Sequence, residues 1–507
     1  MLARAATALS GQRLVTMNKI TIVSVWILAA LGLVAGSSGI ASQTNNPPTG
    51  DGNTIRIASS DTNLVNIFNW AKATSQSYVG KDSDPVGPWY EAALPGREAF
   101  CIRDVSHQCI GAEILGQGKQ NLNMLRKFVE NISEAKDYCS YWEINRHNKP
   151  APVDYASDDD FWYNLNANFD IIDACFKLYE WTGNKTYIHD EKFDRFFRLT
   201  LNDYVERWQL QPGKIMDRPA SMNLKPSTVK YKYARGIPSY DESQTDLTVS
   251  GDLLGMIYNG SRIYAKILSA RNQSQPSEKY AKQASDYRQL IESRWWDKAS
   301  QSYFAFFKSD KKFYPGGISS SEFLLWYNVI EDPSRIIKSL RDISNSQVEV
   351  LSYLPMLFYR YGLNQEAYEF LGKIYTDKRR AYPEASCGAI EGIVRGLMGV
   401  EPSAAEGILT TCPRLTAKTA WVTVENIPVY SGLISVQHRG SSKTSFTNKS
   451  DQAVTWRAMF QGAFARISVN GRLLPAKPRS DAIGKMHSYV EVAVSPKSEA
   501  VAEAMAQ

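Results

Sequence analysis

The chain has 507 residues, of which 43% are hydrophobic, 22% charged and 11% aromatic, and its formal net charge is +6 at pH 7. This composition excludes a disordered chain, a collagen-like fibre and a small disulfide scaffold, and the mean hydropathy of −0.34 excludes a polytopic membrane protein. No block of Lys and Arg stands out, so nothing in the sequence indicates a nucleic-acid partner.

The N-terminal residues 1–42 are predicted to be a secretory signal peptide. A basic segment precedes an apolar run at 20–36, small residues follow it, and cleavage is expected after Ala41. The run is shorter than the roughly 20 residues that a spanning helix needs; an uncleaved anchor helix is the alternative. The protein is therefore expected to be secreted or periplasmic, with membrane contact only through the signal peptide. Residues 43–56 are rich in Pro, Gly and Asn and are predicted to be a linker.

From residue 57 to 404 the hydrophobic pattern is helical. Helices are predicted at 61–77, 104–115, 121–132, 165–181, 193–208, 253–268, 278–296, 319–329, 333–342, 347–361, 364–376 and 387–398. Mostly apolar helices alternate with amphipathic ones, and an apolar helix is buried on most sides whereas an amphipathic one has a solvent face. This alternation predicts a mainly α protein whose catalytic region is a double ring of helices, an (α/α)6 toroid barrel.

The pattern changes near residue 405. Short β-rich runs are predicted to be strands at 419–424, 433–438, 444–447, 453–459, 465–469 and 489–494, and Asn470-Gly471 is a strong hairpin turn. The sequence therefore predicts a small antiparallel β-domain over residues 405–507.

The chain has six cysteines, at positions Cys101, Cys109, Cys139, Cys175, Cys387 and Cys412. In an oxidising compartment they could form disulfides, and Cys101 and Cys109 could pair. No Cys-x-x-Cys motif occurs, so zinc and redox chemistry are not indicated. No cofactor is expected, and a calcium ion near the acidic run 158–160 would have a structural role only.

Carboxylates and aromatic residues recur in the segments that precede the apolar helices, which would gather at one end of a helical double ring. The candidate site residues are Arg103, Asp104, His107, Trp142, Glu143, Asp160, Trp162, Asn164, Tyr240, Glu242, Glu349, Tyr353, Tyr382 and Glu384. Aromatic faces stack on sugar rings, and carboxylates bind hydroxyls. Hydrolysis of a glycosidic bond needs two carboxyl groups, one to protonate the leaving oxygen and one to activate water or attack carbon. Burial among aromatics keeps the acid protonated near neutral pH.

Each of these residues also has a structural interpretation. Asp104 could be a helix N-cap, Glu349 could serve the positive end of a helix, and the run 158–160 could be a solvated loop or a set of calcium ligands. Trp142 and Trp162 could pack in the core, Glu242 and Glu384 could form turns, and His107 could have a structural or binding role. Their joint placement is what favours a sugar site.

Three segments resemble motifs of a known superfamily. Arg103-Asp104-Val-Ser-His is similar to a Trp-Asp-Ser motif, with Arg103 in place of Trp, and Gly251-Asp252-Leu253-Leu254 looks like a mid-barrel Asp-Leu helix. Residues 391–402 (EGIVRGLMGVEP) are similar to a Gly-Leu-Leu-Gly-Ile-x-Pro ending. Over roughly residues 60–405 the chain thus resembles the six-hairpin glycosidases, the (α/α)6-barrel hydrolases that include trehalases, processing α-glucosidase-like enzymes and α-L-rhamnosidases.

The resemblance implies roles for four carboxylates. The general acid of trehalase-like relatives precedes a middle inner helix and the base precedes a late one, which implies Glu242 as acid and Glu349 or Glu384 as base. Asp104 is then a sugar ligand or the acid itself. These relatives are mostly inverting, which needs carboxyl groups about 6.5–9.5 Å apart.

The sequence therefore predicts an exported glycoside hydrolase that acts on an oligosaccharide or glycan by carboxylate acid/base catalysis and inverts configuration. One alternative is a polysaccharide lyase with Tyr240, Tyr353 or His107 as base. Another is a non-catalytic glycan-binding protein.

Overall fold

The computed structural model describes residues 54–220, 222, 224, 235–244, 246–316, 320–343 and 347–505. The predicted signal peptide at 1–42 and most of the predicted linker at 43–56 lie outside these residues. Residues 51–507 belong to one unit by their contacts. Within the described ranges, no helix has both the length and the apolar character that crossing a membrane requires.

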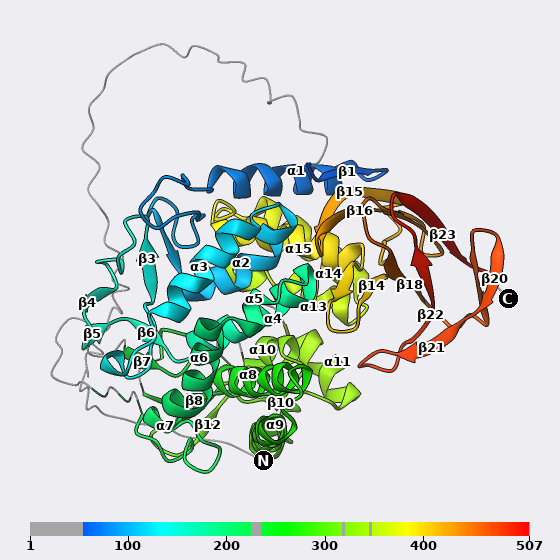
Figure 1. The fold of residues 1–507 in the computed structure, drawn as a ribbon. Helices are drawn as coiled ribbons and strands as arrows, with labels where there is room; N and C mark the ends of the chain where they lie inside the picture. The colour runs from blue at the N-terminus through cyan, green and yellow to red at the C-terminus, as the bar shows by residue number, and fades with distance from the viewer. Residues whose placement is uncertain are drawn as a thin grey trace, which may run out of the picture. The chain divides into compact units, whose positions relative to one another are not determined.

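The described residues from 54 to 400 are dominated by helices (Figure 1). The α-helices are α1 (Thr62–Ser77), α2 (Ile102–Ile114), α3 (Gly118–Glu130), α4 (Ala167–Thr182), α5 (Thr186–His189), α6 (Glu191–Leu199), α7 (Val205–Arg207), α8 (Gly251–Ala270), α9 (Ser274–Arg294), α10 (Ser320–Trp326), α11 (Pro333–Asp342), α12 (Val348–Leu351), α13 (Leu354–Arg360), α14 (Asn364–Thr376) and α15 (Pro383–Glu391). A 3₁₀ turn lies at Glu134–Lys136, and π-helical turns at Thr200–Tyr204 and Gly392–Leu397 extend α6 and α15.

Each predicted helix is present, and the local sequence explains most of the boundaries. Asp61 caps α1 by accepting hydrogen bonds from two backbone N–H groups, and α4 ends at Gly183, whose φ of +69° suits glycine. The helix predicted at 347–361 is instead divided into α12 and α13. Pro355 explains the break because its ring has no N–H to donate to the preceding turn and clashes with the carbonyl there.

The mostly apolar helices pack on one another. α2 lies against α4 and α15, α4 against α8, and α8 against α10. Gly111 of α2 is in the closest of these contacts, because a Cβ at this position would overlap the carbonyl group of Cys387 in α15. The two helices can therefore approach this closely only with glycine at position 111.

We expect Gly111→Ala to destabilise the protein by about 1–3 kcal/mol, because the added methyl group forces α2 and α15 apart. The matched control is Gly372→Ala in α14, where a Cβ would meet no atom within 4 Å. That change should stabilise the helix by about 0.5–1 kcal/mol. Urea unfolding midpoints of the two variants should therefore move in opposite directions, and a Gly111→Ala midpoint at or above that of the wild type would contradict the packing argument.

Short strands link the helices, and longer strands form the C-terminal region. The linking strands are β2 (Ala99–Cys101), β3 (Glu143–Asn145), β4 (Tyr155–Ser157), β5 (Asp160–Phe161), β6 (Tyr163–Asn164), β7 (Arg235–Ile237), β8 (Leu247–Ser250), β9 (Trp296–Asp297), β10 (Ser302–Tyr303), β11 (Phe306–Lys308) and β12 (Phe313–Tyr314). The C-terminal strands are β13 (Glu401–Ser403), β14 (Ile408–Thr411), β15 (Trp421–Val429), β16 (Gly432–Arg439), β17 (Lys443–Asn448), β18 (Val454–Gln461), β19 (Arg466–Val469), β20 (Arg472–Pro475), β21 (Lys477–Ser480), β22 (Met486–Val494) and β23 (Ser498–Ala504).

The C-terminal strands form two sheets. One has the order β1-β15-β16-β17-β23-β19-β20 and the other β13-β14-β18-β22-β21. They share a core in which Phe446 of β17 stacks on Trp456 of β18. The predicted hairpin at Asn470-Gly471 joins β19 to β20, and both turn residues have positive φ. The prediction of a purely antiparallel domain is wrong at one pair, because β14 and β18 run parallel.

The strand β1 (Arg56–Ser59) comes from the other end of the chain and pairs antiparallel with β15 (Figure 1). It begins at Arg56, the last residue of the predicted linker. The C-terminal sheet is therefore completed by residues that precede the first helix.

All six cysteines are buried free thiols, so the predicted Cys101–Cys109 pairing does not occur. Cys109 Sγ instead donates a hydrogen bond to the carbonyl of Ser106, 3.2 Å away. Burial raises the pKa of the Cys101 thiol well above its usual value, which keeps it unreactive.

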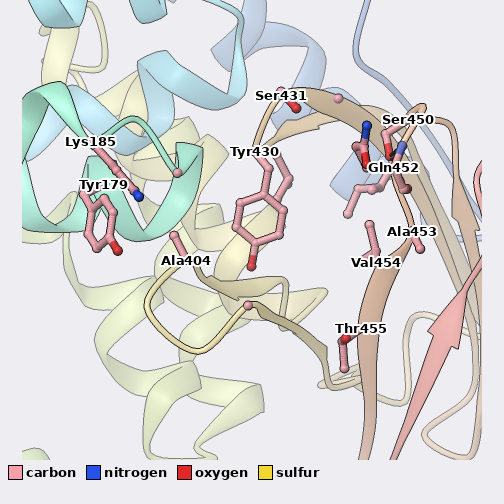
Figure 2. A pocket seen from close by; sticks show the side chains of 15 residues that line it. Tyr179, Lys185, Ala404, Tyr430, Ser431, Ser450, Gln452, Ala453, Val454 and Thr455 are labelled. Atoms are coloured by element: carbon pink, nitrogen blue, oxygen red, sulfur yellow. Dashed lines mark hydrogen bonds between the residues drawn. The ribbon is translucent and has the colours of Figure 1, made fainter. Parts of the chain in front are cut away.

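A pocket of about 310 Å³ lies between the C-terminal end of α4 and the strands β15, β16 and β18 (Figure 2). Tyr179 and Lys185 line it from the helices, and Tyr430 and Gln452 line it from the sheet region. None of the described residues that line it is Asp or Glu. It therefore offers no carboxyl pair for acid/base chemistry.

Candidate active site

Helix α2 brings three of the candidate residues together. Arg103, Asp104 and His107 are separated by one, three and four positions, and residues three or four apart share a helix face. Cys101 is the N-cap of α2, and Asp104 lies in the first turn after it. The interpretation of Asp104 as an N-cap is therefore wrong.

The segment between β7 and β8 supplies Tyr240 and Glu242. Asp252, in the first turn of α8, holds this segment by accepting hydrogen bonds from the Tyr240 backbone N–H at 2.6 Å and from the Ser239 hydroxyl at 3.2 Å. Asp241 is held in turn, because its N–H donates to the Ser239 hydroxyl at 2.9 Å. The backbone just before Glu242 is thus fixed to the start of α8.

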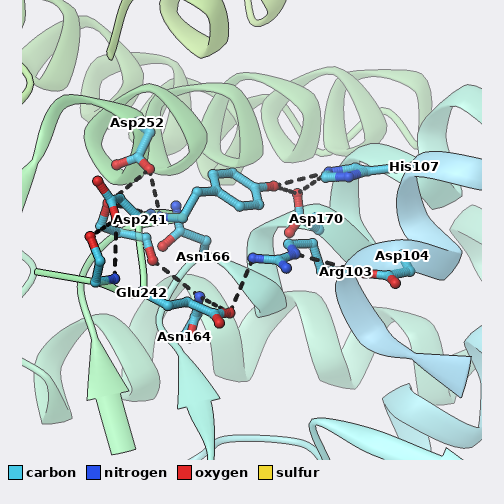
Figure 3. Close-up of polar contacts among 12 residues, drawn as sticks. Arg103, Asp104, His107, Asn164, Asn166, Asp170, Asp241, Glu242 and Asp252 are labelled. Atoms are coloured by element: carbon cyan, nitrogen blue, oxygen red, sulfur yellow. Dashed lines mark hydrogen bonds and ion pairs between the residues drawn. The ribbon is translucent and has the colours of Figure 1, made fainter. Parts of the chain in front are cut away.

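Arg103 lies between the carboxylates of Glu242 and Asp104 (Figure 3). Its Nη1 is 3.3 Å from Glu242 Oε1, and its Nε is 3.8 Å from Asp104 Oδ1. The guanidinium carbon lies 5.4 Å from the ring centres of both Trp142 and Tyr240, so two aromatic rings hold its position. The side chain of Glu242 is 35% exposed whereas that of Asp104 is 4% exposed, so solvent reaches the Glu242 side of the pair.

Asp104 has the properties of a carboxylic acid that keeps its proton near neutral pH. Burial and the nearby Glu384 raise its pKa to about 7, against the opposing effects of Arg103, Tyr382 and His107. The Tyr382 hydroxyl donates to Asp104 Oδ2 at 2.6 Å and orients the carboxyl group.

His107 lies at the centre of a second polar network. Its Nε2 is 3.0 Å from the Tyr240 hydroxyl, which donates to Asp170 Oδ1 at 2.6 Å. Its Nδ1 is 2.9 Å from Glu384 Oε1, which also accepts from the Tyr353 hydroxyl at 2.5 Å. Burial opposes protonation of His107, but the hydrogen bonds to Asp170 and Glu384 outweigh it and raise its pKa to about 9. The imidazolium therefore holds α2, α4 and α15 together through two carboxylates.

The raised pKa of His107 makes stability depend on pH. An unfolded histidine has a pKa near 6.5, so the charged network contributes fully below about pH 6.5 and is lost as the pH rises through about 9. We expect this loss to reach about 3 kcal/mol. Thermal unfolding of wild type and His107→Gln between pH 6 and 9.5 should show a larger decline in the wild type, and parallel declines would contradict the assignment.

The remaining predicted residues have varied surroundings. Asn164 Nδ2 donates to Glu242 Oε1 at 3.2 Å and so joins the first network. Glu143 pairs with Arg97 at 2.8 Å, and burial, with the nearby Asp154, raises its pKa to about 8. The other placements are Trp142 beside Arg103, Trp162 half-buried against Ile237, Asp160 at the start of β5, and Glu349 within α12, where its side chain lies outside the described residues.

The acidic run at residues 158–160 is a candidate set of calcium ligands. Asp158 accepts a hydrogen bond from the Tyr155 hydroxyl at 2.7 Å. No group of three or more Asp, Glu, His or Cys side chains suited to a metal occurs in the part of the chain that the structure describes. A structural calcium ion at 158–160 therefore stays a prediction.

Three residues of the networks were not predicted from the sequence. Asp170 of α4 has a buried Oδ2 without a hydrogen-bond partner among the described residues. Phe323 of α10 stacks on Tyr240, with the centres of the two rings 4.2 Å apart. Asp252 holds the segment that carries Glu242. The available signal for Asp170 was that the apolar run 165–181 contains two aspartates, at 170 and 173, because a buried carboxylate needs a partner. Nothing local distinguishes Phe323 from core residues.

Comparison with known proteins finds similar structures at low sequence identity. The sequence matches no family model and no curated protein. An α-L-rhamnosidase from Dictyoglumus thermophilum has a TM-score of 0.58 and 11% identity, covering 89% of this chain and 50% of that one. The GH78 family rhamnosidase of Bacillus sp. GL1 has a TM-score of 0.56 and 11% identity, covering 79% of this chain and 41% of that one. The Aspergillus terreus α-L-rhamnosidase has a TM-score of 0.51 and 10% identity, covering 87% of this chain and 50% of that one.

The chain spans half or less of the length of these three rhamnosidases. At such identities the similarity concerns the fold alone. It agrees with the motifs noted in the sequence, and the chain accordingly shares the fold of these rhamnosidases over the matched residues.

Proposed function

We propose that the protein is a glycoside hydrolase that inverts configuration in a single displacement. The observation that carries the proposal is the pair of carboxyl groups on either side of Arg103, one protonated near neutral pH and one facing solvent. Inverting hydrolysis needs an acid and a base about 6.5–9.5 Å apart. The guanidinium of Arg103, with Glu242 3.3 Å from its Nη1 and Asp104 3.8 Å from its Nε, separates the two carboxyl groups by a distance of this order.

In this proposal Asp104 is the general acid and Glu242 is the base. Asp104 carries a proton up to about pH 7 and can donate it to the leaving oxygen. Glu242 is held by Arg103 and Asn164, reaches solvent and activates the water that attacks carbon. Glu384, beside Asp104 and held by Tyr353 and His107, helps to keep the proton on Asp104 and can accept a hydrogen bond from a sugar hydroxyl.

The proposal extends to architecture and location. Contacts join α15 to α2, α2 to α4, α4 to α8 and α8 to α10, and α13 packs on α15. Arg360 of α13 donates to the carbonyl of Trp326 in α10 at 2.6 Å, which supports closure of an (α/α)6 ring. The catalytic barrel would cover residues 57–404 and the β-domain 405–507, with β1 completing the latter. The protein would act outside the cytoplasm after removal of residues 1–42.

The electrostatics of the site do not favour the lyase alternative. A lyase needs a base to remove a carbon-bound proton. His107 is already protonated at neutral pH, and burial raises the pKa of Tyr240 and Tyr353 well above the usual value, which disfavours a phenolate base.

The test is a screen of aryl glycosides, including α-L-rhamnosides because of the structural relatives, and plant oligosaccharides. Proton NMR should first show the sugar anomer opposite to that of the substrate. The double variant Asp104→Asn, Glu242→Gln is the control for contaminating enzymes. Tight binding without turnover would favour a glycan-binding protein, a product absorbing in the ultraviolet would favour a lyase, and a retained anomer would exclude single displacement.

A further inference from the structure

A cleft of about 340 Å³ lies away from the candidate active site. It is lined by the C-terminal parts of α4 and α8, by the ends of α10 and α13, and by residues of β18 and β21. Asp170 faces the active-site network from the first turn of α4, whereas Trp181 lines the cleft from its last turn. At about 1.5 Å per residue these positions are roughly 16 Å apart along the helix. The lining also includes Asp173, one turn after Asp170, but it contains none of the residues of the two active-site networks, so the cleft has a lining of its own.

Seven cationic side chains line this cleft, against four carboxylates. Three of the cations are matched by carboxylates: Lys177 by Asp173, Arg395 by Glu391 and Glu401, and Arg457 by Glu406 and Glu491. The other four are Arg262, Lys266, Arg360 and Arg479. Among the described residues, none of these four has a carboxylate within 4 Å. The cleft thus holds an excess of positive charge that nearby carboxylates neutralise only in part.

The partners of these four cations are weak or absent among the described residues. Arg262 Nη2 donates to the Asn259 side-chain oxygen at 2.6 Å, while its buried Nε has no partner. Arg360 donates only to the carbonyl of Trp326 and lies 5.0 Å from the ring centre of that residue. Burial and the neighbouring Arg262 lower the pKa of Lys266, against the opposing charges of Glu180 and Glu406. Crowded cations of this kind repel one another unless an anion lies between them.

Positive charge at helix C-termini has an ordinary explanation, because the helix dipole favours cations there. This explanation fits Arg360, the last residue of α13. It does not fit Arg262, which lies eight residues before the end of α8, or Arg479, which lies on the strand β21. A second groove of about 380 Å³ along α8 and α9 also begins at Arg262 and Lys266, so two hollows meet at these cations.

We propose that this cleft binds a phosphate or sulfate group, with Arg262, Arg360 and Arg479 as its ligands. Guanidinium groups match such oxyanions with paired hydrogen bonds. The adjoining groove along α8 and α9 leaves room for a sugar or other polar group attached to the anion. The proposal does not depend on the activity proposed for the other site.

The test is isothermal titration calorimetry of the whole protein with inorganic phosphate, inorganic sulfate and glucose 6-phosphate, at constant ionic strength in chloride. Glucose is the neutral comparison. Saturable binding is expected, and Arg262→Gln with Arg479→Gln should weaken it at least about tenfold, because charge-assisted hydrogen bonds are lost. Tighter binding of glucose 6-phosphate than of phosphate would identify a sugar-borne anion, and equal binding would identify the free ion.

Two controls separate a site from general charge or misfolding. Arg341→Gln with Arg472→Gln removes the same charge from exposed positions elsewhere and should leave binding unchanged. Arg262→Lys keeps the charge but loses the paired hydrogen bonds, so it should weaken binding less than Arg262→Gln does. The proposal is overturned if neither anion binds more strongly than chloride, or if the cleft variant binds as tightly as the surface variant.

Discussion

Replacement of Asp104 by Asn is expected to lower kcat/KM about 10²–10⁴-fold on glycosides with alkyl leaving groups, the range typical of a lost general acid. Asparagine keeps the shape of the side chain and the contact with Tyr382 but has no proton to donate to the glycosidic oxygen. On aryl glycosides with acidic leaving groups, which depart without protonation, the loss should be small. The difference in kcat/KM loss between alkyl and aryl glycosides therefore shows whether Asp104 donates the proton.

The pH dependence of kcat/KM is a second test of Asp104→Asn. Because the pKa of Asp104 is raised to about 7, the wild-type kcat/KM should be high below pH 7 and fall as the pH rises above it. The Asn variant should lose this alkaline limb. Glu113→Gln is the control, since Glu113 is a largely buried carboxyl on the same helix that contacts Asn121. A full loss with acidic leaving groups as well would show that Asp104 is not the acid.

Replacement of Glu242 by Gln is expected to lower kcat/KM about 10²–10⁴-fold whatever the leaving group, because the attacking water loses its base. Added azide needs no base and should restore turnover, releasing a glycosyl azide of inverted configuration. Asp246→Asn, an exposed carboxyl in the same inter-strand segment, should change activity less than twofold, which is within surface-substitution effects.

The same measurements on Glu384→Gln test whether Glu242 or Glu384 is the base. Two results together would change the assignment: azide rescue of Glu384→Gln, and preserved hydrolysis of aryl glycosides by Glu242→Gln. They would make Glu384 the base and Glu242 the acid. That outcome would agree with the roles that the superfamily resemblance implies by position. Unchanged activity in all three variants would remove the carboxyl pair from the mechanism.

Helix positions could be predicted well from the sequence because apolar periodicity, Asp N-caps and Gly183 act within a few residues. The strands β1 and β23 could not. β1 is four residues long and has no hairpin partner nearby, since its partner β15 is more than 360 residues away in the chain. Pairing at such distances is decided by tertiary packing, which a local pattern does not record.

The candidate site could be predicted in part for the same reason. Arg103, Asp104 and His107 could be found because they lie where the first apolar helix begins. Asp170 and Asp252 complete the networks from apolar helices, and their roles depend on contacts with distant residues that the sequence does not show. The raised pKa of Asp104 depends on its burial and on the charge of Glu384, which lies 280 positions later in the chain, so it appears only in three dimensions.

The pairing of β1 with β15 also sets the order in which the protein can be completed during synthesis. Ser60 donates its backbone N–H to the carbonyl of Trp421 at 3.1 Å, so the first strand waits for a partner made 361 residues later. At about 5–20 residues per second this wait is roughly 20–70 s. Throughout it the edge of β1 has no partner and is open to wrong pairing. A chain shortened to its helices would keep that open edge permanently, so a version made without the C-terminal sheet should aggregate less if β1 is removed as well.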